Sequence, residues 1–362
     1  MSAGYRLFSL AGALAGPRVR RRAAGFSPAA IRRIWVHKPD HLGDALLARP
    51  ALAALRAAYP QAEIVFACHP PAAALLAADV LGYRLEPWDS PFLGGGGSWL
   101  KYRAAVRRRS PDLLINLRHD VRDILLCTAC RPRFLATYDH EGTGRLATHP
   151  GRPPEEAKPE ADNHLSLLAE TLRIAPATVP PLPLTPAAQT AAAVWDSLPG
   201  DGPRIVLHAA ARTPAKLWPA AHWRALLGLL AERTRARLAF IGGGDDRPFN
   251  QIILHGQNGR AADWAGRFDL AQTAGIVAAA DLLIGVDSGP GHLAKAVGTP
   301  VVTLMSGTNV APRWAPDPAR ALAHPVACAP CRKERCPVAG HPCLRDLTPA
   351  EVLGAVERWW RT

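Results

Sequence analysis

The fold of this chain is decided by the stretch "DLLIGVDSGPGHLAKAVGTPVVTLM", residues 281–305. Two apolar runs, at 281–286 and 299–305, enclose a short turn and a segment with a helical pattern. The turn carries Asp287, Ser288 and Gly289 directly before that helix. It fits any α/β protein, but a helix N-terminus also offers free N–H groups and a positive dipole end to an anion. The stretch therefore predicts strand, helix and strand, and it raises the question of an anion site between them.

Length and composition indicate a folded, basic protein with two domains. The chain has 362 residues, of which 48% are hydrophobic and 20% are charged, and chains of this length usually divide into two cores. Lysine and arginine outnumber the acids by 43 to 30, which gives a formal net charge of +13. Such an excess favours an anionic partner: nucleic acid, a phosphorylated sugar or lipid, or an anionic membrane face.

The first 30 residues are predicted to form a disordered leader. Arginines follow the apolar part of this segment, whereas in a signal peptide the positive charges come first. The alternative is a segment that docks weakly on an anionic membrane surface. No apolar run reaches the ~20 residues that a membrane span needs, so we expect a cytoplasmic protein with reduced cysteines.

Apolar runs alternate with helical patterns on both sides of a proline-rich segment. The expected strands are residues 31–37, 62–68, 111–117, 204–210, 237–244, 281–286 and 301–305. Helical runs at 45–59 and 220–236 follow two of them, and such alternation is typical of parallel sheets. The pattern predicts two Rossmann-like lobes, 31–174 and 187–347, whose parallel sheets face a central cleft. A stiff linker at 175–186 joins them, and a helix at 348–362 closes the chain.

Three loops in the second lobe are expected to lie along one edge of its sheet. They are His208–Lys216, Gly242–Asp246 and Asp287–His292, and ligands of open α/β sheets bind at the carboxyl ends of the strands. Together they offer a cation, close-approach glycines, carboxylates and a helix N-terminus, which fits a nucleotide diphosphate. The chain has neither a G-x-G-x-x-G at its first strand nor a P-loop, which argues against a dehydrogenase and an ordinary NTPase. It also has no Asp-x-Asp to hold a divalent metal on a diphosphate.

In the first lobe, Asp44 follows Gly43 at the turn from a strand into a helix. An acid at this position commonly caps the helix. The functional alternative is a carboxylate that takes a proton from a bound hydroxyl, with Gly43 allowing the backbone to turn.

Four segments together resemble glycosyltransferase family 9, the ADP-heptose:lipopolysaccharide heptosyltransferase family. They are "HKPDHLGDALLARPALAALRAAYPQAEIVFAC" (37–68), "KLWP" (216–219), "AGRFDLAQTAGIVAAADLLIGVDSGPGHLAKAVGTPVVTLMSGTN" (265–309) and the cysteine-rich "CAPCRKERCP…CL" (328–344). The resemblance runs from about Ile34 to the last helix. It implies a GT-B fold, with the acceptor on the first lobe and an ADP-sugar on the second, and metal-independent transfer with inversion.

The resemblance also implies roles for single residues. Asp44 matches the family's proposed general base, and Lys216 matches the lysine that meets the donor phosphates. Residues that match the family's donor site are Asp287, Ser288, Gly289, His292 and one of Asp245 and Asp246. Residues that fall in the acceptor motif are Gly43 and Lys38. The chain departs from the family pattern at His37-Lys38, Ala209-Ala210 and Ser306-Gly307-Thr308, which leaves the sugar and the acceptor open.

Four cysteines crowd the end of the chain, at positions Cys328, Cys331, Cys336 and Cys343. Their number fits a structural zinc site, but their spacing is irregular for a zinc ribbon or knuckle. We expect reduced thiols packed in a loop, with structural zinc as the alternative.

The sequence therefore predicts an inverting, metal-independent glycosyltransferase without a cofactor. It would move heptose or a related sugar from an ADP-sugar to an anionic, lipid-linked lipopolysaccharide core acceptor. It would work in the cytoplasm, free or in peripheral contact with the inner face of the inner membrane. A different GT-B nucleotide-sugar transferase or an epimerase is the first alternative. A nucleic-acid-binding protein with a cysteine metal cluster is a distant one, because the arginines are scattered along the sequence and not interleaved with aromatic residues.

Overall fold

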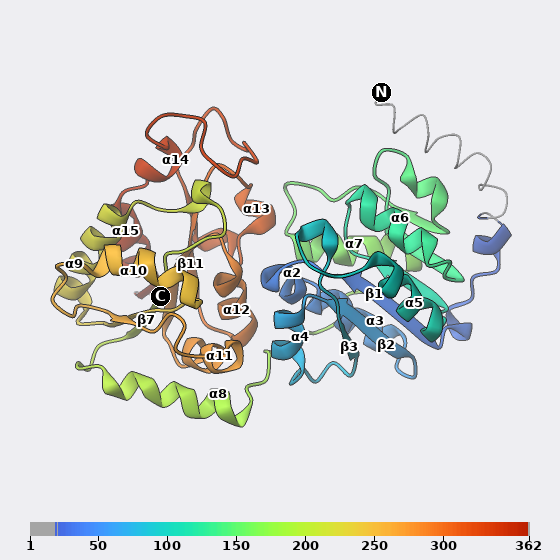
Figure 1. The fold of residues 1–362 in the computed structure, drawn as a ribbon, viewed down its shortest axis with the longest axis horizontal. Helices are drawn as coiled ribbons and strands as arrows, with labels where there is room; N and C mark the ends of the chain where they lie inside the picture. The colour runs from blue at the N-terminus through green and yellow to red at the C-terminus, as the bar shows by residue number, and fades with distance from the viewer. Residues whose placement is uncertain (1–18, 20, 361–362) are drawn as a thin grey trace. The chain divides into compact units, whose positions relative to one another are not determined.

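The computed structural model describes residues 19 and 21–360 of the chain. The chain forms two compact units, Met1–Pro180 and Pro181–Thr362, each built on one sheet (Figure 1). The boundary lies inside the proline-rich segment, where residues 173–185 form neither helix nor strand.

The first unit contains a six-stranded parallel sheet in the order β3-β2-β1-β4-β5-β6. Its strands are β1 (Arg33–Lys38), β2 (Glu63–Cys68), β3 (Arg84–Pro87), β4 (Leu113–Asn116), β5 (Phe134–Tyr138) and β6 (His149–Gly151). β1 lies at the centre, with Trp35 opposite Val65 of β2 and Leu114 of β4. The predicted strands at 31–37, 62–68 and 111–117 are confirmed, each a little shorter or shifted at its ends.

Helices and 3-10 turns connect the strands of the first unit. They are η1 (Pro28–Ala30), α2 (Leu42–Leu47), α3 (Arg49–Ala58), α4 (Pro70–Leu76), η2 (Pro91–Leu93), α5 (Trp99–Arg109), α6 (Val121–Ala129), η3 (Thr143–Leu146) and α7 (Glu160–Leu172). The single helical run expected at 45–59 is wrong, because the helix breaks at Ala48 and restarts at Arg49. Pro50 has no N–H to donate to the preceding turn, which suits the start of a new helix and not the middle of a long one.

Part of the expected leader is ordered. Residues 21–24 are helical, and the ring of Phe26 packs edge-on against Phe134, with 5.0 Å between ring centroids, and against His149, with 4.5 Å. The structure therefore places residues 21–30 on the first unit, whereas the sequence predicted disorder up to residue 30. Residues 1–18 and 20 lie outside the described part of the chain.

The second unit repeats the architecture with the strand order β12-β11-β10-β7-β8-β9, again parallel throughout. Its strands are β7 (Arg204–His208), β8 (Arg237–Phe240), β9 (Ala262–Asp263), β10 (Leu282–Val286), β11 (Val301–Met305) and β12 (Ala321–Ala323). Its helices and 3-10 turns are α8 (Pro186–Ala191), η4 (Ala192–Ser197), η5 (Pro214–Lys216), α9 (Ala220–Thr234), η6 (Gly244–Asp246), α10 (Arg247–Leu254), α11 (Leu270–Ala278), α12 (Gly289–Val297), α13 (Ala311–Trp314), η7 (Pro318–Arg320), α14 (Pro342–Arg345) and α15 (Pro349–Trp360). The strand–helix–strand reading of residues 281–305 is confirmed by β10, α12 and β11.

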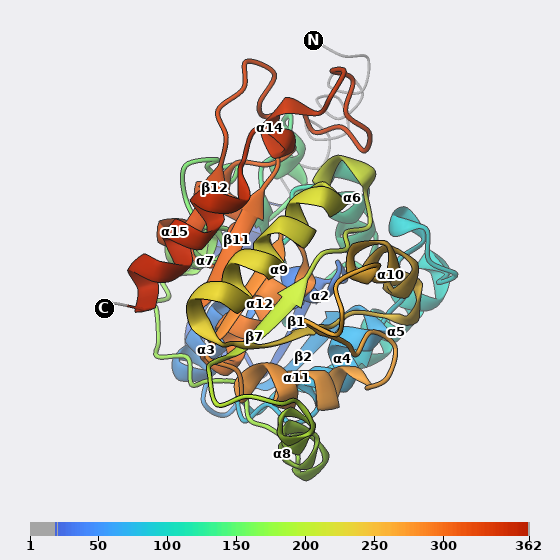
Figure 2. The same ribbon diagram turned by 90° about the vertical axis from the view of Figure 1, so that its left-hand side faces the viewer.

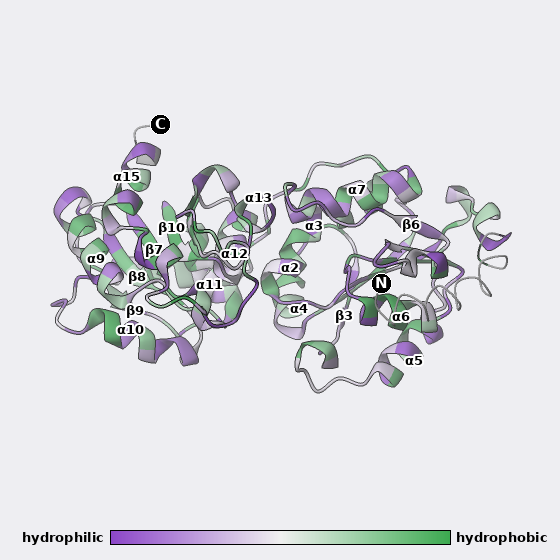
Figure 3. Ribbon diagram, turned by 90° about the horizontal axis from the view of Figure 1, so that it is seen from above, coloured by the Kyte–Doolittle hydropathy of each residue, from purple (hydrophilic) through white to green (hydrophobic). Residues whose placement is uncertain are grey.

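Two hydrophobic layers enclose this second sheet. On one face, Trp223 of α9 and Val352 of α15 pack against the strands, together with Trp218 from the segment before α9 (Figure 2). On the other face, Trp195 and Ile276 do the same from η4 and α11. Figure 3 shows hydrophobic and hydrophilic residues together along α9, as expected of a helix with one face toward the sheet.

The last helix begins with a cap at Thr348. The side chain of Glu351 accepts the Thr348 N–H at 2.7 Å, and Thr348 Oγ1 accepts the Glu351 N–H at 3.3 Å, which is a reciprocal capping box. Among the described residues, no helix is long and apolar enough to span a membrane.

Candidate active site

Three loops of the second unit leave the carboxyl ends of adjacent strands. β7 lies between β10 and β8, so the segments after His208, Phe240 and Val286 share one edge of the sheet. This confirms the expected alignment of the three loops, and that edge is where open α/β sheets bind ligands.

Lys216 and Asp287 form the central ion pair of this edge. Lys216 ends η5, and its Nζ lies 2.7 Å from Asp287 Oδ2. Asn309 donates a hydrogen bond of 2.7 Å to the same oxygen. The Asp287 side chain is almost fully buried, while 23% of the Lys216 side chain remains accessible. A buried carboxylate thus holds a lysine whose ammonium can still reach a ligand.

Ser288 turns its hydroxyl away from the helix that it precedes. Ser288 is the N-cap of α12, yet its side chain accepts no N–H of that helix. Its Oγ donates to the Val286 carbonyl at 3.0 Å and lies 2.9 Å from His208 Nδ1. The first turn of α12 is therefore not capped by its own side chain, and Pro290 in that turn has no N–H to satisfy. Gly289 opens the helix, and His292 is buried one turn further along.

His208 is a residue whose role the sequence did not reveal. It ends β7 and is buried, with Nδ1 toward Ser288 and Nε2 lying 3.8 Å from Asp246 Oδ2. The second distance is too long for a hydrogen bond but allows charge attraction. The imidazole thus links the loop at Asp246 to the loop at Ser288. Its place at a strand end was visible in the sequence, but its two partners are distant in sequence from it.

The structure distinguishes Asp245 from Asp246. Asp246 accepts the Gly243 N–H at 2.8 Å. Burial works to raise the pKa of Asp246, but His208 and this N–H outweigh it, so the pKa lies below its ordinary value. Gly242 has a φ of 153° and a side chain there would collide with Asp246, which explains why the loop needs glycine. Asp246 is engaged in holding the loop, whereas Asp245 is exposed.

In the first unit, Lys38 is held between two carboxylates. It ends β1 and is 3% exposed, and its Nζ lies 2.7 Å from Asp40 Oδ2 and 3.2 Å from Asp44 Oδ1. The Asp44 side chain keeps 22% of its surface accessible, compared with 4% for Lys38. Asp44 is therefore the member of this group that a ligand can reach.

Arg118 and His37 extend this group into a longer network. Arg118 follows β4, and its Nη1 lies 2.6 Å from Asp40 Oδ1 while its Nε lies 3.0 Å from Asp123 Oδ2. The other oxygen of Asp123 lies 2.9 Å from His37 Nε2. We call these six residues the ion-pair chain: Asp44, Lys38, Asp40, Arg118, Asp123 and His37.

Burial and neighbouring charges shift the pKa of three members of the ion-pair chain, Asp44, Asp40 and Lys38. Burial raises the pKa of Asp44, and the positive charge of Lys38 offsets only part of this effect. Burial opposes charge on Asp40 and Lys38 as well. In these two cases the opposite charges prevail, so the pKa of Asp40 is lowered and that of Lys38 is raised. Glu160, at the start of α7, adds to the negative potential around Lys38. Asp44 is the carboxyl of this group that holds a proton more readily than an ordinary aspartate.

Gly43 and Asp44 differ from their expected local roles. Gly43 is a buried residue inside α2 and does not adopt a positive φ, so it does not make the turn. His41 is the N-cap of α2, and Asp44 is the third helical residue. The positive end of the helix dipole thus stabilises the negative charge of Asp44, although Asp44 does not occupy the cap position.

The cysteine-rich loop is hydrogen-bonded to two loops at the carboxyl edge of the second sheet. The Cys331 N–H donates to the Gly307 carbonyl at 2.8 Å, and the Ala215 N–H donates to the Glu334 carbonyl at 3.0 Å. Cys343 is buried and Cys328 is exposed. Burial raises the pKa of the Cys343 thiol, and the three other cysteines of the cluster contribute to this shift. Within the described residues, no group of three or more His, Cys, Asp or Glu side chains is arranged to hold a metal ion.

Comparison with known proteins relates this geometry to one family. Residues 99–341 match the model of glycosyltransferase family 9 (heptosyltransferase). Lipopolysaccharide heptosyltransferase 1 of Pseudomonas aeruginosa is 26% identical over 322 residues, which cover 84% of this chain and 87% of that protein. The structure of ADP-heptose LPS heptosyltransferase II of Escherichia coli aligns with a TM-score of 0.70 at 20% identity, over 91% of this chain and 98% of that chain. The predicted GT-B fold class is confirmed.

A third similar structure is that of a protein that contains iron. The structure of the iron-containing dodecameric glycosyltransferase TibC of enterotoxigenic Escherichia coli aligns with a TM-score of 0.56 at 16% identity. It covers 91% of this chain, which in turn covers 76% of TibC. At this identity the likeness concerns the fold alone.

Proposed function

The chain belongs to glycosyltransferase family 9, and we propose that it transfers heptose, or a related sugar, from an ADP-sugar to a lipopolysaccharide core acceptor. The observation that carries the proposal is the pairing of Lys216 with Asp287 beside the uncapped start of α12. A cation and a helix N-terminus at the same strand edge are what a diphosphate needs.

On the donor side, the leaving group is the diphosphate of the ADP-sugar. Lys216 and the first turn of α12 stabilise the charge that develops on it as the bond to the sugar breaks. Asp287 orients Lys216, and His208 keeps Ser288 in place. The exposed Asp245 is our candidate for the ribose hydroxyls, since Asp246 is engaged with Gly243. His292 is buried one helical turn after Gly289 in α12 and completes the donor site.

On the acceptor side, Asp44 acts as general base. It takes the proton of the acceptor hydroxyl, the oxygen forms a bond to the anomeric carbon, and the bond from that carbon to the diphosphate breaks with inversion. ADP leaves with the bonding electrons. The raised pKa of Asp44 supports this role, because a carboxylate that binds a proton more tightly is a better base. Lys38 positions Asp44, and acceptor contact falls to the residues around Gly43.

We further propose that the reaction needs neither a metal nor a cofactor. The chain has no Asp-x-Asp, and Lys216 with the α12 N-terminus supplies positive charge at the diphosphate. The cysteine cluster stands apart from this chemistry in our proposal, although it supports the loop that carries Lys216. We place the enzyme in the cytoplasm, in peripheral contact with the membrane that carries its acceptor.

A panel of nucleotide sugars tests the proposal. ADP-heptose should raise the melting temperature more than UDP- or GDP-sugars, because a ligand that binds only the folded state stabilises it by mass action, ~2.7 kcal/mol at a hundredfold excess over Kd. Mass analysis should then show a heptose added to a lipopolysaccharide core acceptor. Turnover of a different nucleotide sugar would change the donor, and a sugar isomerised without any acceptor would favour the epimerase alternative.

A further inference from the structure

A basic pocket opens at the amino edge of the first sheet, on the edge opposite to Lys38 and Asp44. It has a volume of about 420 Å³. The residues that line it are Arg22, Arg107, Ser110, Pro111, Asp112, Cys130, Arg131, Pro132 and Arg133. Three segments of the chain, around residues 22, 107–112 and 130–133, thus bring four arginines to one place.

The positive charge of this pocket is not neutralised by the protein. All four arginines are exposed, and within the described part of the chain none of them forms an ion pair with a carboxylate. Asp112 is the one acid of the lining. Its carboxylate already accepts hydrogen bonds from the backbone N–H groups of Arg32 and Arg33, each at 2.9 Å. The pocket therefore presents a net positive potential to an anion.

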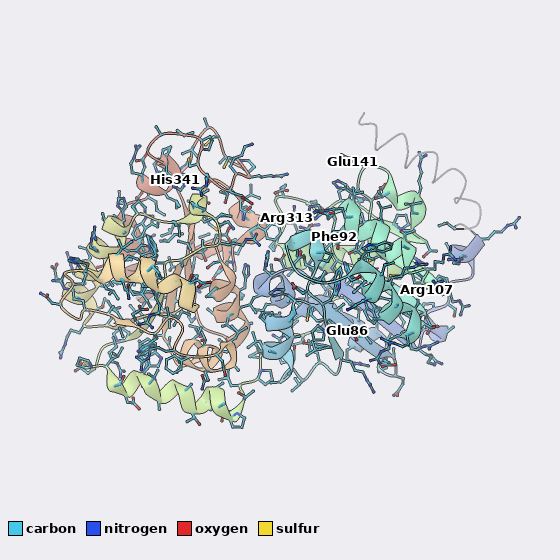
Figure 4. All side chains as sticks on the ribbon, viewed as in Figure 1. Glu86, Phe92, Arg107, Glu141, Arg313 and His341 are labelled. Carbon is cyan, nitrogen blue, oxygen red and sulfur yellow. The ribbon has the colours of Figure 1, made fainter. Side chains whose placement is uncertain are left out.

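Helix α5 continues this basic surface and adds an apolar end. Tyr102 and Val106 pack inward, while Lys101, Arg107 and Arg108 point to solvent. Figure 4 labels Arg107 on this helix. At the other end of α5, Trp99 is 47% exposed and Leu100 is 56% exposed. The helix contains no acidic residue.

These features are typical of a surface that lies on a bilayer. Exposed Trp and Leu beside Lys and Arg characterise interfacial helices. A small soluble phosphate compound would use the pocket but leave the apolar end of α5 without a role. A single nucleic-acid strand is recognised by aromatic rings between the cations. Here Trp99 and Arg107 are eight residues apart, about 12 Å along the helix.

We propose that the outward face of α5 and the adjoining arginine pocket dock the first unit on an anionic phospholipid surface, with a lipid phosphate in the pocket. The proposal rests on the proposed function, because a lipid-linked acceptor brings the enzyme to a membrane. α5 runs from the carboxyl edge of the sheet, where Asp44 lies, to the amino edge, where the pocket lies. A bilayer along α5 would therefore pass beside the acceptor edge.

Vesicle sedimentation of the full chain tests the docking surface. Wild type should bind vesicles of phosphatidylglycerol and phosphatidylcholine, and should not bind phosphatidylcholine alone. The variant Arg107→Glu/Arg133→Glu should bind at least about 25-fold more weakly, since each basic residue at such a surface is worth about fivefold. The matched control Arg152→Glu/Arg233→Glu makes the same charge change at two other exposed arginines and should stay within about twofold of wild type. Trp99→Ser should weaken binding even in high salt, where the electrostatic part is screened.

Several results would overturn the docking surface. If Arg107→Glu/Arg133→Glu and the control Arg152→Glu/Arg233→Glu lose vesicle binding to the same extent, the effect is one of general charge and not of this surface. Competition by inorganic phosphate at low concentration would show a soluble ligand, and tighter binding of single-stranded RNA, lost in the same variant, would show a nucleic-acid surface. If Arg107→Glu/Arg133→Glu lowers the melting temperature, Arg107→Gln/Arg133→Gln repeats the test without charge reversal.

Sugar transfer to a soluble acceptor is measured in parallel. If the protein binds vesicles as expected but transfers no sugar, only the proposed function is contradicted. If it transfers sugar but Arg107→Glu/Arg133→Glu binds vesicles as tightly as wild type, only this inference is contradicted.

Discussion

Lys216 Nζ lies 2.7 Å from Oδ2 of Asp287, a carboxylate that also accepts a hydrogen bond from Asn309. The aspartate fixes the direction of the lysine and is itself too buried to meet a ligand. A diphosphate bound at this edge would share the ammonium with Asp287, so the lysine need not move to bind its ligand. Such preorganisation favours the charge that grows on a leaving group.

Lys216→Ala should weaken ADP binding and turnover together. A hydrogen bond to a charged group is worth ~1.5–3 kcal/mol, so we expect Kd for ADP to rise by roughly ten- to hundredfold. Calorimetric titration with ADP measures the change. Lys295→Ala removes an exposed lysine from the last turn of α12 and should leave Kd unaltered. Unchanged affinity in Lys216→Ala would mean that this lysine does not contact the donor.

Asp44→Asn should abolish most turnover while the fold and the donor site are retained. Asparagine keeps the shape of the side chain but cannot accept the proton, so kcat should fall by ~10²–10⁴-fold. Donor affinity and melting temperature should change little. Asp162→Asn, an exposed acid in the first turn of α7, serves as the control with full activity. Retained turnover, or a loss that follows unfolding, would restrict Asp44 to a structural role.

The pH profile should report the environment of Asp44. Its pKa is raised by burial, so the acidic limb of kcat/KM should lie above the ordinary aspartate value of ~3.9. The charge of Lys38 opposes this rise, and Lys38→Met should therefore move the limb to higher pH. A folded-state pKa that is raised also means that Asp44 stabilises the fold at low pH, and that this contribution is lost as pH rises through the raised pKa. A limb that moves to lower pH in Lys38→Met would contradict the assignment of Asp44 as the base.

Phe26 should contribute to the stability of the first unit. Its ring contacts Phe134 and His149, and aromatic pairs are worth ~0.5–1.5 kcal/mol beyond the area that they bury. Phe26→Ala should lower the urea midpoint of this unit, and deletion of residues 1–28 should do the same. Deletion of residues 1–18 leaves both contacts in place and is the control. Equal midpoints for the two deletions would show that the Phe26 contacts add nothing.

The cysteine cluster should contain less than one equivalent of zinc or iron in protein purified under reducing conditions. The three other cysteines contribute to the raised pKa of the Cys343 thiol, but no group of three or more His, Cys, Asp or Glu side chains among the described residues is arranged to hold a metal ion. Elemental analysis before and after chelation checks this expectation. A stoichiometric metal whose removal lowers the melting temperature would show that the loop is a structural metal site.

Local sequence patterns predicted the sheets but not the contacts that join them. The strands around Asp287 were readable because each apolar run is bounded by polar or glycine residues. The break between α2 and α3 was missed because a long apolar helical pattern outweighed a single proline. The partners of His208 are out of reach of such reasoning, since Ser288 is 80 residues away in the chain. The same holds for the basic pocket, because only the fold brings its scattered arginines together.

The ion-pair chain also has a consequence for how this enzyme can diverge. Lys38, Asp40 and Arg118 each lie between two opposite charges, so a single exchange such as Asp40→Asn leaves both Lys38 and Arg118 short of a partner. Removing one member of a buried pair is more damaging than replacing both members together. Homologues that alter one link should therefore carry a compensating exchange at its neighbour, and the six positions should be inherited as a block.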